Sequence, residues 1–157
     1  MMTPQIAEVI ESSLSPQSAA TRGSSGRLLT SLGAERTAPQ PRWLDSVVER
    51  ANIILGLQNN WDSYGAPAPS PHAVKDAVDF ISLAAEGVPG LLKPDLFPCN
   101  DGAVSVQWEG KDYFIEVEFR AGGRIVFRVE RGDEEFEMKY IFDVRPILEN
   151  LHRYTVN

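Results

Sequence analysis

The sequence contains very little cysteine, because Cys99 is the only one among its 157 residues. A single cysteine excludes an intramolecular disulfide and leaves no cluster of thiolates that could hold a structural zinc ion. Long apolar runs are also missing, since none approaches the roughly 20 residues that a membrane-spanning helix needs. Residues 1–14 carry two glutamates and no basic residue, whereas a secretory signal begins with positive charge. We therefore expect a cytoplasmic protein that does not associate with membranes.

Recognisable catalytic and metal-binding patterns are absent as well. The two histidines stand alone, His72 near the start of one expected helix and His152 near the end of another. The sequence has no His-Glu-x-x-His or Cys-x-x-Cys pair, no Gly-x-Ser-x-Gly turn and no glycine-rich phosphate loop. Cys99 has no base near it in the sequence that could activate it, so we expect an unreactive thiol. The sequence thus predicts no cofactor, no metal site and no catalytic residue.

Charge is distributed unevenly along the chain, whose formal net charge is −7. Residues 1–42 hold four Arg against three Glu, whereas residues 43–157 hold eleven basic and nineteen acidic side chains. Such an acidic body argues against direct binding to nucleic acids, because contact with their phosphates depends on Lys and Arg. It is compatible with a partner protein that has a basic surface.

Composition divides the chain into three segments. Residues 1–14 predict a short amphipathic helix that needs something to dock on. Its apolar face includes Ile6, Val9 and Ile10. Residues 15–40 are rich in Ser, Ala, Gly, Thr, Pro and Arg, a composition typical of a flexible linker. Residues 41–157 predict a single α+β domain.

Three helices are expected in this domain. Apolar residues recur at helical spacing over residues 41–58, and either of the two asparagines that follow can adopt the left-handed conformation that ends a helix. The second helix starts at Ser70 as N-cap, with a proline in its first turn, and ends at Gly87. The third is capped by Asp143 and runs through Leu151.

From residue 103 onward the apolar period changes from 3.6 to 2, which predicts β-strands. Directly opposed residues of an antiparallel pair lie on one face of the sheet, so the parity of each hairpin tests the assignment. A Gly-Lys turn pairs Trp108 with Tyr113, which keeps the parity. A Gly-Asp turn pairs Val129 with Phe136, which also keeps the parity. The middle connection must contain an odd number of residues to keep the apolar side chains on one face, and the loop at 121–123 has three.

The predicted fold is a two-layer α/β sandwich in which two helices pack on one face of a four-stranded antiparallel meander, with a C-terminal helix after it. Residues 95–97 leave room for a further short edge strand. On the opposite face, Arg128 is expected to lie between Glu116 and Glu137. This alternation of charge predicts a solvated face.

The meander also places two of its turns at the same end of the sheet, where carboxylates gather. We call this group the acidic sheet end: Glu109, Asp112, Glu130, Asp133, Glu134 and Glu135. The bases at the same end are Lys111 and Arg131. Glu130 and Glu135 are expected to be directly opposed, which costs free energy. The group could bind a basic protein surface or imitate nucleic-acid phosphates, or it could be a solvated hairpin end that deters edge aggregation.

Residues 59–70, which we call the Trp61 loop, join the first two helices. A Trp and a Tyr stand there among turn residues, and each can bury roughly 150–250 Å², so we expect an ordered, packed connection. Trp61 is expected to fill the gap between the helices and the sheet, Asp62 to bond backbone amides, and Gly65 to take a positive φ. The residues of this structural motif are Trp61, Asp62, Ser63, Tyr64, Gly65 and Ser70, with Ser63 bonding amides like Asp62.

An enzyme built on this loop is an alternative. It would need Asp62, Tyr64 and His72 to converge on a pocket, with Asp62 or Tyr64 acting as acid or base. We give more weight to the structural role.

Two separated motifs stand out in the domain. The first reads Trp-Asp-Ser-Tyr-Gly-Ala-Pro-Ala-Pro-Ser at residues 61–70, and the second reads Asp-Gly-Ala-Val-Ser-Val-Gln-Trp at residues 101–108. Together they resemble a widespread family of small bacterial and phage-borne proteins, over about residues 50–130. Gln107 departs from the pattern, because the family often has Glu there. The resemblance implies a partner protein such as an antitoxin, an immunity protein or an inhibitor of a defence system.

The function that these observations favour is a non-enzymatic module that occupies the surface of another protein. Its expected contacts are the acidic sheet end together with Ile6, Val9 and Ile10. A structural subunit of a larger bacterial or phage assembly is the main alternative.

Overall fold

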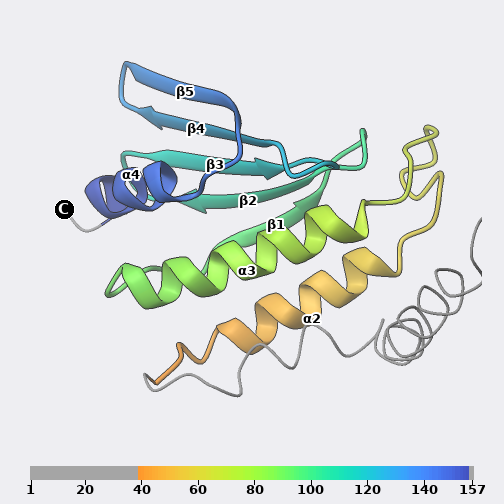
Figure 1. Ribbon diagram of the computed structural model, residues 1–157, viewed down its shortest axis with the longest axis horizontal. Helices are drawn as coiled ribbons and strands as arrows, with labels where there is room; N and C mark the ends of the chain where they lie inside the picture. The colour runs from red at the N-terminus through yellow and green to blue at the C-terminus, as the bar shows by residue number, and fades with distance from the viewer. Residues whose placement is uncertain (1–38, 156–157) are drawn as a thin grey trace, which may run out of the picture. The chain divides into compact units, whose positions relative to one another are not determined.

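The structure is a computed structural model that describes residues 39–155 (Figure 1). The predicted helix at residues 1–14 and the predicted linker up to residue 38 lie outside the described residues. The described elements are α2 (Leu44–Leu55), α3 (Pro71–Gly87), β1 (Asp95–Pro98), β2 (Val104–Glu109), β3 (Phe114–Phe119), β4 (Ile125–Arg131), β5 (Glu134–Ile141) and α4 (Arg145–Thr155).

The strands form one antiparallel sheet in the order β1-β2-β3-β4-β5. Helix α3 packs against β2 and β3, while α2 packs against α3 and β1. Figure 1 shows α2 and α3 side by side along one face of the sheet. The described residues therefore form a fold of the α+β class. None of their helices is long and apolar enough to cross a membrane.

The predicted four-stranded meander beneath two helices is wrong in two respects. First, the sheet has a fifth strand, because Asp95–Pro98 pairs with β2. Prolines stand immediately before this strand and at its end, and they weaken the strand pattern in the sequence. Second, the principal neighbours of α2 are α3 and β1 rather than the meander. The Arg50 side chain of α2 marks this contact, since its Nε donates to the Leu96 carbonyl at 3.1 Å.

The expected start of α3 is observed, but α2 is shorter than expected. Ser70 is the N-cap of α3, where its Oγ accepts from the Ala73 N–H at 3.4 Å, and Pro71 is the first helical residue. Helix α2 ends at Leu55 because Gly56 caps it, so the asparagines that follow are not its C-cap.

Helix α4 follows the expected cap but extends further than expected. The Arg145 N–H donates to Asp143 Oδ1 at 3.0 Å. The helix then runs to Thr155, one turn beyond the predicted end at Leu151. Its buried side chains are Ile147 and Leu151.

The last two predicted hairpins are confirmed by the strand pairing. Val129 lies opposite Phe136, as the two-residue Gly-Asp turn requires. Phe119 lies opposite Ile125, and the Arg120 N–H donates to the Arg124 carbonyl across a three-residue loop.

The first hairpin differs from the prediction, because Trp108 pairs with Ile115 instead of Tyr113. The turn lies one residue later, and the Gly110 N–H donates to the Tyr113 carbonyl at 2.9 Å. A Cβ on Gly110 would lie 2.2 Å from the Tyr113 ring, so this glycine makes room for the ring instead of supplying a positive φ. A shift of one turn residue moves the pairing by two, so every side chain of β2 and β3 keeps its predicted face. On β5 the register shifts between Met138 and Ile141, so the expected alternation is not kept to the end of that strand.

Trp108 holds α3 on the sheet. Its side chain is buried, and its Nε1 donates to the Leu92 carbonyl at 3.0 Å. Phe80 of α3 meets the Trp108 ring edge-on, with centroids 6.1 Å apart, and lies 5.5 Å from the Phe119 ring. Edge-on and tilted aromatic pairs add about 0.5–1.5 kcal/mol each to the free energy of burial.

Candidate functional site

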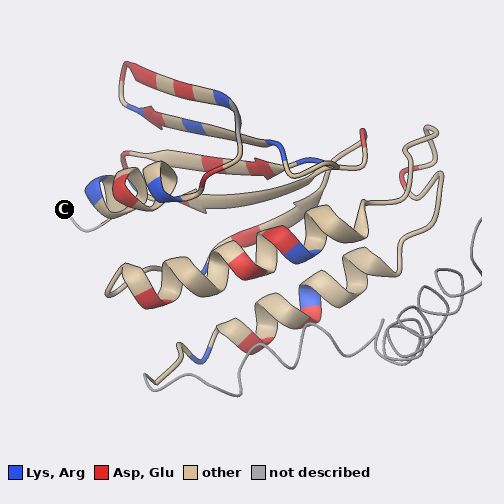
Figure 2. Ribbon diagram, viewed as in Figure 1, with Lys and Arg blue, Asp and Glu red and all other residues tan. Residues whose placement is uncertain are grey.

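The acidic sheet end forms where the β2–β3 and β4–β5 turns lie at the same end of the sheet (Figure 2). One cross-strand row there runs from Glu109 through Phe114 and Glu130 to Glu135, so the expected Glu130–Glu135 opposition is present. All six carboxylates are exposed. Within residues 39–155, none of the six makes an ion pair. Their charge is therefore left to solvent or to a partner.

The β4–β5 turn holds part of this group in a defined position. Gly132 has φ +60° at the first central position of a two-residue turn, the arrangement that fits the twist of a hairpin. A hollow of about 470 Å³ lies beside it, lined by Val129, Arg131, Asp133, Glu134, Glu135, Phe136 and Tyr154. Carboxylates next to aromatic rings suit a Lys or Arg side chain, through ion pairing and cation–π contact.

Sequence reasoning missed the aromatic part of this hollow. Phe136 lies on the predicted inner face of the sheet, yet 43% of its surface is exposed, because β5 is the edge strand. Tyr154 lies in the last turn of α4, beyond the predicted end of that helix. The sequence could have placed Tyr154 beside this hollow only if α4 had been predicted to extend past Leu151.

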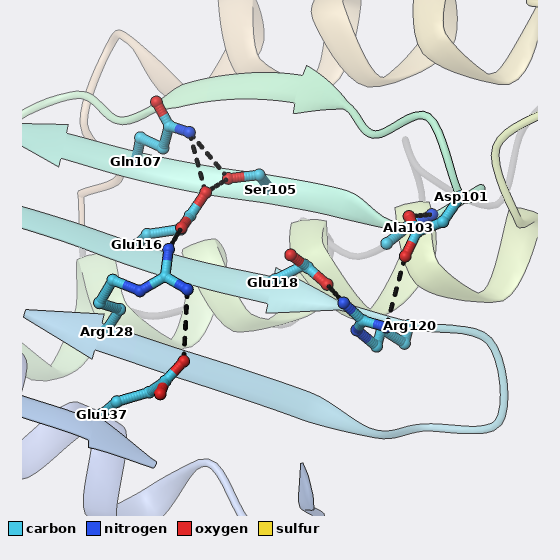
Figure 3. A network of polar contacts seen from close by, with 9 residues as sticks. All are labelled: Asp101, Ala103, Ser105, Gln107, Glu116, Glu118, Arg120, Arg128 and Glu137. Atoms are coloured by element: carbon cyan, nitrogen blue, oxygen red, sulfur yellow. Dashed lines mark hydrogen bonds and ion pairs between the residues drawn. The ribbon is translucent and has the colours of Figure 1, made fainter. Parts of the chain in front are cut away.

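The face turned away from α2 and α3 carries the predicted charge ladder, formed by Glu116, Arg128 and Glu137 (Figure 3). Arg128 Nη1 donates to Glu116 Oε2 at 2.8 Å, and Nη2 donates to Glu137 Oε1 at 3.3 Å. Hydrogen bonds from Lys139 and then from Arg128 lower the pKa of Glu137. In contrast to the acidic sheet end, each carboxylate of the ladder is paired with a cation.

Gln107 extends this network toward β1. Its Nε2 donates to Ser105 Oγ at 3.0 Å and to Glu116 Oε1 at 3.1 Å, and the Ser105 hydroxyl donates to the same carboxylate at 2.7 Å. A glutamate at position 107 would place a second carboxylate beside Glu116. The departure of Gln107 from the motif therefore fits the ladder of this chain.

The polar side chains of the Trp61 loop form hydrogen bonds with the backbone of the same loop. Asp62 Oδ1 accepts from the N–H groups of Tyr64 at 2.8 Å and Ala66 at 3.0 Å. These two bonds lower the pKa of Asp62 below its ordinary value of 3.8. The carboxylate thus holds a turn and stays ionised, which suits it poorly to proton transfer at neutral pH.

Its neighbours behave in the same way. Asn60 Oδ1 accepts from the Gly65 N–H at 2.8 Å, and Trp61 Nε1 donates to the Pro67 carbonyl at 3.1 Å. Gly65 has the expected positive φ, +94°. Ser63 differs from its expected role: it contributes its backbone, with φ +65° and an N–H that donates to the Asn60 carbonyl.

Tyr64 is not packed as expected, since 93% of its surface is exposed. Trp61 is half-buried and bonds within the loop. The loop is joined to the sheet by its backbone, because the Ser70 N–H donates to the Gly102 carbonyl at 2.9 Å. A Cβ on Gly102 would lie 3.4 Å from the Ala68 carbonyl oxygen, so the two segments are in close contact.

The other candidate residues are not assembled into a site. His72 is exposed, and no hydrogen bond joins its side chain to that of Asp62 or Tyr64 among the residues in view. Burial, reinforced by Glu118 and other nearby carboxylates, raises the pKa of Cys99 to about 12, so its thiol stays protonated. The part of the chain that the structure describes holds no group of three or more metal-ligating side chains. Ile6, Val9 and Ile10 lie outside that part.

Known proteins add nothing to these observations. No family model matches the chain, and neither a curated protein nor a solved structure matches it. The resemblance carried by residues 61–70 and 101–108 therefore stays a prediction.

Proposed function

We propose that the chain is a non-enzymatic protein-binding module that occupies a basic surface of its partner with the acidic sheet end. The motif resemblance adds a context to this proposal: a cytoplasmic bacterial or phage-borne antitoxin, immunity protein or inhibitor of a defence system. The observation that carries the proposal is the set of six exposed carboxylates at one end of the sheet, with Glu130 opposite Glu135.

The repulsion between the carboxylates of the acidic sheet end supports a role in binding. Like charges opposed across strands destabilise a sheet, and the acidic sheet end has only Lys111 and Arg131 against its six carboxylates. A basic partner surface would offset the repulsion, and complementary charge would also accelerate association. The hollow between Phe136 and Tyr154 offers room for a cationic side chain at the centre of such a contact.

The proposal is tested by affinity capture from the cells in which the gene occurs, with identification by mass spectrometry. The sheet-end variant combines Glu130→Gln, Asp133→Asn, Glu134→Gln and Glu135→Gln. A control variant removes the same charge elsewhere with Asp45→Asn, Glu49→Gln, Asp95→Asn and Glu149→Gln, all of them exposed.

We expect the wild type and the control variant to capture the same basic protein, and the sheet-end variant to capture at least about tenfold less of it. Equal recovery by all three baits would show that the acidic sheet end is not the binding surface.

A further inference from the structure

The two edges of the sheet differ in how they are protected. Strand β1 has only four residues and ends in a proline, which is a usual way to blunt an edge. Strand β5 has eight residues without Pro or Gly, and no strand adjoins its outer side in the described part of the chain. Its pairing with β4 is regular from Glu134 to Met138, and the register shifts only after that. Figure 1 shows β5 at the margin of the sheet. An edge of this length is a template for another strand.

We propose that β5 is a dimerisation edge, to which β5 of a second copy of this chain adds in antiparallel orientation. The two sheets would then continue as one, with a two-fold axis beside Met138. The charges along β5 select both this occupant and this register.

Antiparallel pairing around a two-fold axis allows few registers, because directly opposed residues must share a face. A centre at Glu137 opposes two Glu137 side chains, and a centre at Lys139 opposes two lysines. A centre at Phe136 opposes Glu135 with Glu137. A centre at Met138 instead places Glu137 opposite Lys139 of the second copy, twice over.

The same register fits the backbone. In a two-residue hairpin the pair beside the turn, here Arg131 and Glu134, exchanges hydrogen bonds, and the pattern then alternates as far as the Phe127–Met138 pair, beyond which the register shifts by one residue before Ile141. The backbone groups of Glu135 and Glu137 consequently point away from β4. With the axis at Met138, these outward groups face the second copy.

The charge ladder supports a second copy over an unrelated strand. Across β3, β4 and β5 it alternates from Glu116 to Arg128 to Glu137 (Figure 3). Lys139 of the second copy would come next, so the alternation of sign continues through the interface. Lys139 Nζ already pairs with Glu137 Oε2 of its own strand at 2.9 Å, and the dimer would join two such pairs into a ring of four charges.

The acidic sheet end stays free in this dimer. Antiparallel addition carries the two β4–β5 turns to opposite ends of the joined sheet, so the two acidic groups do not repel each other at close range. The dimer would present two binding surfaces that face apart.

The test uses sedimentation equilibrium of the full chain from micromolar to submillimolar concentration. Glu137→Lys places lysine opposite Lys139 of the second copy, and Lys139→Glu places glutamate opposite Glu137. We expect the wild type to dimerise, and each variant alone to dimerise at least about tenfold more weakly, because like charges are opposed. An equimolar mixture of the two variants restores both pairs, so it should dimerise as the wild type does.

Lys93→Glu is the matched control, since Lys93 is exposed and precedes β1 at the other edge of the sheet. It should dimerise like the wild type, and circular dichroism should show all variants folded. A wild type that stays a single chain throughout, single variants that dimerise normally, or a mixture that dimerises no better than its components would each overturn the proposal.

Discussion

The Trp61 loop and the acidic sheet end are both crowded with polar residues, but they use them in opposite ways. In the loop, the side chains of Asp62 and Asn60 accept hydrogen bonds from three consecutive backbone N–H groups, those of residues 64–66. At the sheet end, carboxylates of the same kind form no ion pair within residues 39–155. Polar groups that satisfy the backbone stabilise the fold, whereas unpaired ones at a fixed position cost stability and are available to a partner.

Among the substitutions that compare the two regions, we expect the largest loss in free energy of unfolding at the contact between the Trp61 loop and the sheet. Gly102 has φ +85° and lies against the Ala68 carbonyl. Gly102→Ala should lower the free energy of unfolding by about 1–3 kcal/mol, measured by urea denaturation.

Gly122→Ala is the matched control, because Gly122 has φ +82° with nothing within 4 Å of an added Cβ. It should carry the backbone strain without the steric contact, and so cost less. An equal cost for both would mean that the loop is not held against the start of β2.

Asp62 is expected to be the next most sensitive position. At neutral pH the denaturation midpoint should fall from wild type to Asp62→Asn to Asp62→Ala, because asparagine keeps an acceptor oxygen and alanine does not. The folded protein lowers the pKa of Asp62, so the stabilisation that comes from its charge is present above pH 3.8 and is lost as pH falls through the lowered pKa. Wild type and Asp62→Asn should therefore converge in acid. A constant gap between them at every pH would show that the charge of Asp62 contributes nothing to the turn.

At the sheet end a smaller effect of opposite sign is expected. Glu130→Gln and Glu135→Gln should each raise the free energy of unfolding by about 0.2–1 kcal/mol, because each removes one like-charge opposition. The double variant should gain less than the sum of the two, since either change alone relieves the same repulsion. Destabilisation by both single variants, measured by urea unfolding, would place these carboxylates among the groups that hold the fold.

The two regions also differ in how far sequence could predict them. Alternation of apolar residues predicts which face a residue occupies from β2 to Met138 of β5, where the register shifts. The charge ladder and the Glu130–Glu135 pair lie before that shift, so they follow from parity even though the first turn is displaced. Parity is insensitive to that displacement, because pairing moves in steps of two. The ring of Tyr113 lies against Gly110 in the displaced turn, and no apolar pattern indicates this contact.

Two further features could be predicted only in part for similar reasons. Strand β1 follows a proline and ends in one, so the sequence indicated only room for a short edge strand, and its pairing with β2 is what makes it a strand. Tyr64 has the composition of a buried anchor, yet the hydrogen bonds of Asp62 and Asn60 close the loop without it and leave the ring in solvent. Aromatic content could not indicate which ring would be buried.

The central claim is that the acidic sheet end, and not the Trp61 loop, contacts the partner. The most direct measurement is the affinity for the captured partner as a function of salt concentration, for the wild type, the sheet-end variant and Tyr64→Ala. We expect the wild type and Tyr64→Ala to bind alike and to weaken together as salt rises, and the sheet-end variant to bind more weakly with a flatter salt dependence. A sheet-end variant with wild-type affinity and salt dependence, beside a Tyr64→Ala variant that fails to bind, would contradict the account.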